Sequence, residues 1–67
     1  MISYSPFWQT LAKSEVSQYQ LIKFHNISAG QVNRLRNNLP VSTETIRHLC
    51  SILKCNVMDI MEFIPSS

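Results

Sequence analysis

A chain of 67 residues is long enough for one small domain, so a single compact core has to hold it together. Hydrophobic residues make up 45% of the chain, which argues against disorder, and one glycine with three prolines is too little for the many turns of an all-β fold. The net charge is only +2, but residues 17–38 hold three cations and no acid, so positive charge is concentrated there.

Two short helices are predicted in the first part of the chain. The first begins at Ser5-Pro6, with Ser5 as the N-cap and the proline in the first turn, and it runs to about residue 14. The second follows Ser17 as its N-cap and turns Leu21 and Phe24 toward the core. It is expected to end near residue 25.

A tight turn and a third helix come next. Asn26 is suited to a left-handed helix cap, Ile27 is placed to fill the gap between the two helices, and Ser28 is the next N-cap. The third helix covers residues 28–38 and is expected to stop at Leu39-Pro40, because the residue before a proline is pushed out of helical geometry. Two helices joined in this way form a helix-turn-helix pattern.

The rest of the chain predicts two more helices. Ser42 caps the fourth, whose inner stripe is Ile46, Leu49, Cys50 and Leu53. Asn56 with Asp59 predicts a capping box for a fifth helix from Val57 to about Phe63. In an alternative, residues 63–65 are extended and pair with residues 2–4, which leaves a shorter last helix. We therefore expect an all-α fold of five helices, with residues 1–67 as a single domain.

The third helix has little to bury. A helical wheel directs Val32 and Leu35 inward. The opposite face carries one glycine, two amides and one guanidinium: Gly30, Asn33, Arg34 and Asn37. Amides and guanidinium groups read base edges in the major groove, and a glycine would let the backbone approach the groove wall. A solvated face is the plainer explanation, but the place of this helix in a helix-turn-helix, together with the local positive charge, favours DNA recognition.

Two segments of the chain resemble a known family. SQYQLIKFHNISAGQVNRL, residues 17–35, is similar to the helix-turn-helix of Cro and lambda-repressor-type regulators, the xenobiotic-response-element family of bacteria and phages. Gln18 matches the early glutamine of the family's second helix, and Asn26-Ile27-Ser28 stands at its turn, where Asn26 replaces the usual glycine. VSTETIRHLCSILKCNVMDIMEFIP, residues 41–65, resembles the closing helices.

The resemblance implies a lambda-repressor-like fold and a sequence-specific DNA-binding transcriptional regulator, a repressor that inserts helix 28–38 into the major groove of operator DNA. Gln18 and Ser28 would then meet phosphates, and Arg34 is the base-facing position whose side chain can hydrogen-bond a base. The implied DNA-binding residues are Gln18, Ser28, Ala29, Gly30, Gln31, Asn33, Arg34 and Asn37.

The last predicted helix is apolar over more of its circumference than one small core can cover. Met58 lies on the far side from Ile60 if Ile60 points inward. We therefore expect a homodimer, through Met58, Met61 and Phe63, that binds two half-sites. The alternative function is a protein–protein interaction module of helix-turn-helix fold without DNA binding, because a net charge of +2 is small for a DNA-binding protein.

Other classes of function are disfavoured by the reactive residues. Cys50 and Cys55 form no Cys-x-x-Cys pair, and no known zinc spacing joins them to His25 or His48, so we expect two reduced thiols and no metal. Four scattered acids and no phosphate-binding loop offer nothing for a catalytic site. We expect no enzymatic activity, no cofactor and no small-molecule ligand. No apolar run is long enough for a membrane span and no signal peptide is recognisable, so a cytoplasmic protein is expected.

Overall fold

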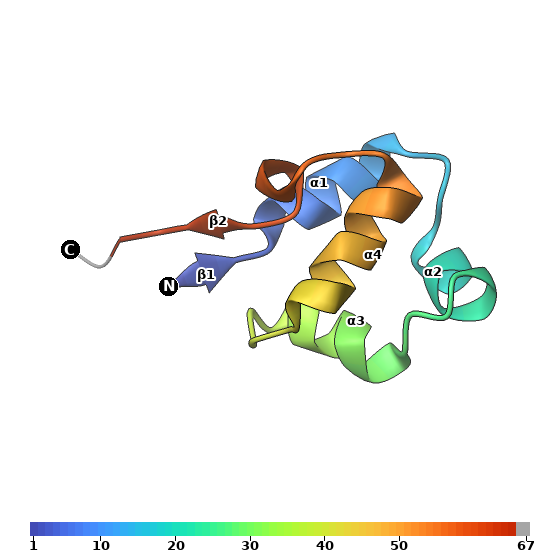
Figure 1. Ribbon diagram of the computed structural model, residues 1–67, viewed down its shortest axis with the longest axis horizontal. Helices are drawn as coiled ribbons and strands as arrows, with labels where there is room; N and C mark the ends of the chain where they lie inside the picture. The colour runs from blue at the N-terminus through green and yellow to red at the C-terminus, as the bar shows by residue number, and fades with distance from the viewer. Residues whose placement is uncertain (66–67) are drawn as a thin grey trace.

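The computed structural model describes residues 1–65. Along the chain these residues form a short strand, four α-helices, a 3₁₀ turn and a second strand. The elements are β1 (Ile2–Ser3), α1 (Ser5–Lys13), α2 (Gln18–Phe24), α3 (Ala29–Arg36), α4 (Thr43–Leu53), η1 (Val57–Asp59) and β2 (Glu62–Phe63). Figure 1 shows α4 crossing the helical body, with the β1–β2 ribbon extending at the end opposite α2. The principal extents of 39 × 22 × 18 Å reflect the way in which this ribbon extends from the helices. None of the helices in residues 1–65 is long and apolar enough to span a membrane.

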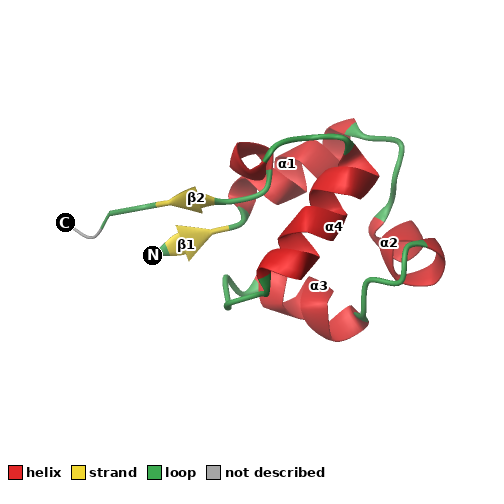
Figure 2. Cartoon of the chain, in the orientation of Figure 1, coloured by secondary structure: helices red, strands yellow, loops and turns green. Residues whose placement is uncertain are grey.

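The prediction of a fifth helix is wrong. Its first three residues form the 3₁₀ turn η1, after which the chain extends into β2 and pairs with β1 in antiparallel register, Ile2 with Phe63 and Ser3 with Glu62 (Figure 2). The alternative of an extended end that returns to the N-terminus is therefore confirmed in its main feature. The backbone groups that a longer helix would have used are bonded instead to the first strand.

Contacts with α1 hold η1 in place. Phe7 N–H donates to the Ile60 carbonyl at 3.2 Å, and Thr10 Oγ1 donates to the Asp59 carbonyl at 2.8 Å. Ile60 is fully buried, and the Asp59 carboxylate accepts from the Asn56 N–H at 3.1 Å, as the predicted capping residues would. These contacts end the turn against α1 and direct the following residues outward.

Serine hydroxyls start three of the four helices, as predicted. Ser17, Ser28 and Ser42 each accept a hydrogen bond from the backbone N–H three residues further on. The first helix differs by one residue, because Tyr4 is the N-cap and Ser5 the first helical residue. Ser3 Oγ accepts from the Ser5 N–H at 3.2 Å and so takes the place of a capping side chain.

The third helix ends two residues earlier than expected. Asn38 takes the left-handed conformation with φ of 56°, and the Leu39 N–H donates back to the Arg34 carbonyl at 2.9 Å. This backward hydrogen bond is characteristic of a Schellman-type C-terminal cap. The cap therefore ends the helix, and Pro40 lies beyond it. Asn26, with φ of 60°, confirms the predicted left-handed cap of α2.

Buried side chains from all parts of the chain form one core. Its apolar members are Tyr4, Phe7, Leu11, Leu21, Ile27, Val32, Leu35, Ile46, Leu49 and Ile60. Phe24, which the helical pattern directed inward, is 65% exposed, because Leu21 alone fills the inner face of the seven-residue α2. The core therefore lies between α1, α3 and α4, with α2 attached along one edge.

Candidate nucleic-acid interface

The turn between α2 and α3 is rigidly built. Asn26 turns the chain in the left-handed region, and the Ile27 N–H donates to the Leu21 carbonyl at 3.1 Å. The Ile27 side chain is 4% exposed and lies in the core, as its place in the pattern predicted. Ser28 then begins α3 by accepting from the Gln31 N–H at 3.1 Å. The start of α3 is thus set by one buried side chain and two backbone-directed bonds.

The inner side of α3 is anchored and its outer side is open. Val32 and Leu35 are buried, 2% and 0% exposed. Seven of the eight predicted DNA-binding residues are exposed: Gln18, Ser28, Ala29, Gly30, Asn33, Arg34 and Asn37. Gln31 is half-buried, and its Oε1 accepts from Thr45 Oγ1 at 3.4 Å, which ties it to the first turn of α4. The structure therefore leaves these seven residues open to solvent on α2 and α3 and at the ends of α3, whereas Gln31 is partly covered.

Gly30 has no packing reason to be a glycine. A Cβ built on it would meet no atom closer than Ser28 Oγ at 3.8 Å, which is ordinary contact, and its φ is not positive. Glycine within a helix is about 1 kcal/mol less favourable than alanine. The fold thus accepts a destabilising residue on the exposed side of the first turn of α3 without gaining any internal contact.

Asn33 and Asn37 form a pair one helical turn apart. Asn37 Nδ2 donates to the Asn33 carbonyl oxygen at 2.9 Å and to Asn33 Oδ1 at 3.3 Å. The two amides are therefore oriented with respect to each other before any ligand arrives.

The guanidinium of Arg34 is held at the C-terminal end of α3. Its Nη1 donates to the Pro40 carbonyl at 3.2 Å. The turn that carries this carbonyl is itself fixed by Tyr4, whose N–H donates to Asn38 Oδ1 at 3.0 Å and whose hydroxyl donates to the Leu39 carbonyl at 2.9 Å. Sequence reasoning missed Tyr4, since partners 34 and 35 residues away leave no periodic signal.

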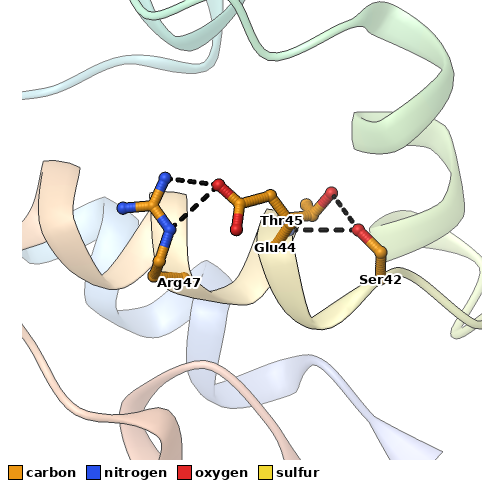
Figure 3. Close-up of polar contacts among 4 residues, drawn as sticks. All are labelled: Ser42, Glu44, Thr45 and Arg47. Carbon is orange, nitrogen blue, oxygen red and sulfur yellow. Dashed lines mark hydrogen bonds and ion pairs between the residues drawn. The ribbon is translucent and has the colours of Figure 1, made fainter.

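Two other arginines are engaged on the protein itself. Arg47 forms an ion pair with Glu44 at 2.5 Å on the first turns of α4, next to the Ser42 cap (Figure 3). The hydrogen bond and charge of Arg47 lower the pKa of the Glu44 carboxyl. The Arg36 guanidinium lies over the Trp8 ring, 5.7 Å from its centroid. Arg47 is thus paired with a carboxylate, whereas the Arg34 and Arg36 guanidinium groups contact a backbone carbonyl and an aromatic ring near the end of α3.

Comparison with known families gives one finding that bears on this surface. The family model described as Cro/C1-type HTH DNA-binding domain matches residues 7–66, which include both helices of the motif and the whole polar surface. Searches of curated proteins and of solved structures gave no match.

Proposed function

The chain belongs to the Cro/C1-type helix-turn-helix DNA-binding family, and we propose that it is a sequence-specific transcriptional regulator that acts as a repressor. In this proposal residues 1–67 act as one DNA-binding domain, and helix 28–38 enters the major groove of an operator. Major-groove insertion of the second helix is the docking geometry of helix-turn-helix proteins.

The observation that carries the proposal is Gly30. Gly30 lies in the first turn of α3, on its exposed side, where an added Cβ would make only an ordinary contact with Ser28 Oγ at 3.8 Å, so the missing side chain has no use inside the folded chain. A close approach between backbone and ligand is the circumstance in which the missing side chain matters. A DNA groove wall against α3 supplies that circumstance, and the amides and guanidinium around Gly30 have the chemistry to read base edges.

The roles of the surrounding residues follow from their positions. Gln18 and Ser28 stand at the N-terminal ends of α2 and α3, where backbone N–H groups favour a phosphate. Arg34 extends from the same face and would pair with a guanine. Ala29 and Gly30 bring the backbone close, and contacts from Asn33, Asn37 and the half-buried Gln31 complete the surface.

The direct test is selection of binding sites from random duplex DNA, followed by titration at several salt concentrations. A DNA-binding regulator should enrich one sequence, and its affinity should fall steeply with salt because phosphate contacts release counterions. A protein–protein interaction module of the same fold should enrich no sequence and show a flat salt dependence. That second result would overturn the proposal in favour of the protein-binding alternative.

We also propose that the regulator works as a homodimer joined through the β1–β2 ribbon. A two-stranded ribbon is marginally stable by itself in water. This ribbon exposes Phe63 at 68%, and the adjacent η1 exposes Met58 at 75%. Met61 contributes less than expected, because it is half-buried against its own core. A second copy that covers Phe63 and Met58 would place two α3 helices on two half-sites.

The oligomeric state in solution tests the dimer. Light scattering after size exclusion should give twice the monomer mass for the wild type. Met58→Asp combined with Phe63→Asp should give the monomer, because each substitution brings a charge to an apolar contact that the monomer does not need. A wild-type chain that stays monomeric both alone and on its selected DNA would exclude the dimer. That result would leave the DNA-binding proposal unchanged.

A further inference from the structure

We propose that Asn33 reads an adenine of the operator and that Asn37 is a positioning residue that holds the Asn33 amide for this contact. The inference rests on the proposed DNA-binding function. It assigns different roles to two exposed residues of the same type, Asn33 within α3 and Asn37 as its C-cap.

The hydrogen bonds between the two amides have a direction, and this direction separates their roles. An asparagine side chain has two N–H donors and a carbonyl oxygen that accepts two hydrogen bonds. Asn37 spends its Nδ2 donors on the Asn33 backbone oxygen at 2.9 Å and on Asn33 Oδ1 at 3.3 Å. Asn37 is left with its oxygen as an acceptor. Asn33 keeps both of its own donors and one accepting position on Oδ1.

The groups left on Asn33 match the major-groove edge of adenine. Adenine presents the N7 acceptor beside the N6 amino donor, and an asparagine amide meets both at once. Asn33 can donate from Nδ2 to N7 and accept from N6 at the free position of Oδ1. The Nδ2 group of Asn37 is already bonded to Asn33, so Asn33 is the amide of the pair whose Nδ2 is free for N7. The bond that Asn33 Oδ1 accepts from Asn37 also polarises the amide, which strengthens the Asn33 N–H groups as donors.

The neighbours of Asn33 leave it accessible. Gly30, about one turn earlier, has no side chain, and the space beside it is open. The guanidinium of Arg34 is directed to the Pro40 carbonyl at the far end of the helix. Asn33 is therefore the bidentate group nearest the middle of the exposed face, with its orientation set from one side by Asn37.

The experiment uses the full chain and the duplex that it selects from random DNA. At one A·T pair of that duplex, replacement by G·C should weaken wild-type binding about 5- to 150-fold. Replacement of the same adenine by 7-deazaadenine, which lacks only the N7 acceptor, should also weaken the wild type. Asn33→Ala should bind all three duplexes about equally, because the group that distinguishes them is gone.

Variants of Asn37 test its positioning role. Asn37→Ala should lower the A·T preference about two- to fivefold, since an exposed amide pair of this spacing is weak and gains strength as the groove excludes water. The double variant should bind the duplexes with the same lack of preference as Asn33→Ala alone, because Asn37 acts through Asn33 and has nothing left to position. Asn37→Gln keeps an amide donor and should restore most of the preference. Gln9→Ala removes an exposed amide from α1 and serves as the control that leaves it unchanged.

Two results would overturn the inference while leaving the proposed function standing. One is an Asn33→Ala protein that keeps the full A·T preference. The other is an Asn37→Ala protein that weakens binding to every duplex alike, which would make Asn37 a general contact. A wild-type chain that selects no sequence and whose DNA binding ignores salt would instead refute the DNA-binding proposal itself.

Discussion

The outer face of α3 and the β1–β2 ribbon both extend beyond the core, and they are supported differently. The polar face of α3 stands on Val32 and Leu35, which are almost completely buried. The ribbon is held together by backbone pairing between β1 and β2, and its Phe63 is 68% exposed. The difference shows that α3 is ordered by the domain's own core, whereas of the ribbon's apolar side chains only Ile2 packs against the core and Phe63 stays largely exposed.

The largest expected effect contrasts the supports of the two regions. Leu35→Ala should lower the free energy of unfolding by ~2–5 kcal/mol, because Leu35 is fully buried and the substitution leaves a cavity. Phe63→Ala in the monomer should lower it by less than about 1 kcal/mol, as is usual for surface substitutions. Urea unfolding of both variants measures the contrast. Equal losses would mean that the ribbon contributes to the core as much as α3 does.

The next effect distinguishes reading from positioning within the α3 surface. Arg34→Ala should weaken binding to the selected duplex by ~1–3 kcal/mol and relax specificity at one base pair, with the salt dependence nearly unchanged. Gln18→Ala should weaken selected and scrambled DNA about equally, because phosphate contacts carry no sequence information. Titrations of both variants at two salt concentrations separate the roles. If Arg34→Ala weakens both DNAs alike and flattens the salt slope by about one unit, Arg34 is a phosphate contact.

A smaller effect links the two regions directly. Tyr4 follows β1, and its hydroxyl bonds to the Leu39 carbonyl in the turn after α3. Tyr4→Phe removes that hydroxyl and should lower the free energy of unfolding by ~0.5–1.5 kcal/mol, the usual value of one hydrogen bond. DNA affinity should fall as well, because the turn also carries the Pro40 carbonyl that holds Arg34. A loss of stability with unchanged DNA affinity would show that α3 does not depend on this link.

The smallest expected change in stability has the opposite sign. Gly30→Ala should raise the free energy of unfolding by up to about 1 kcal/mol, since alanine favours the helix and the added Cβ makes only an ordinary contact with Ser28 Oγ. Its DNA affinity should nevertheless fall, because the methyl group stands where the groove wall would approach. Ser51→Ala, on an exposed position of α4, is the matched control that should stabilise the protein without weakening DNA binding. A Gly30→Ala protein with undiminished affinity would refute the close approach.

Much of the candidate site follows from local sequence signals. Serine caps, the left-handed Asn26 and the spacing of Ile27, Val32 and Leu35 act over a few residues, so each can be recognised without knowing the fold. Once Val32 and Leu35 are known to be buried, helical geometry places the remaining residues of α3 on the exposed face. The orientation of its side chains is different, because the Asn33–Asn37 pairing and the Arg34–Pro40 bond depend on rotamers and on the shape of the following turn.

The sequence by itself determined the four α-helices, the caps of three of them and the buried side of α3, because helix caps and apolar spacing are local properties of the chain. Tertiary structure alone decided the course of the residues after η1. Residues 57–63 carry a helical pattern, yet pairing with Ile2 and Ser3 extends residues 62–63. The same holds for Tyr4 and Asn38, 34 residues apart in sequence and joined by a bond of 3.0 Å. Partners so distant leave no periodicity in a single sequence, so only the packed core brings them into contact.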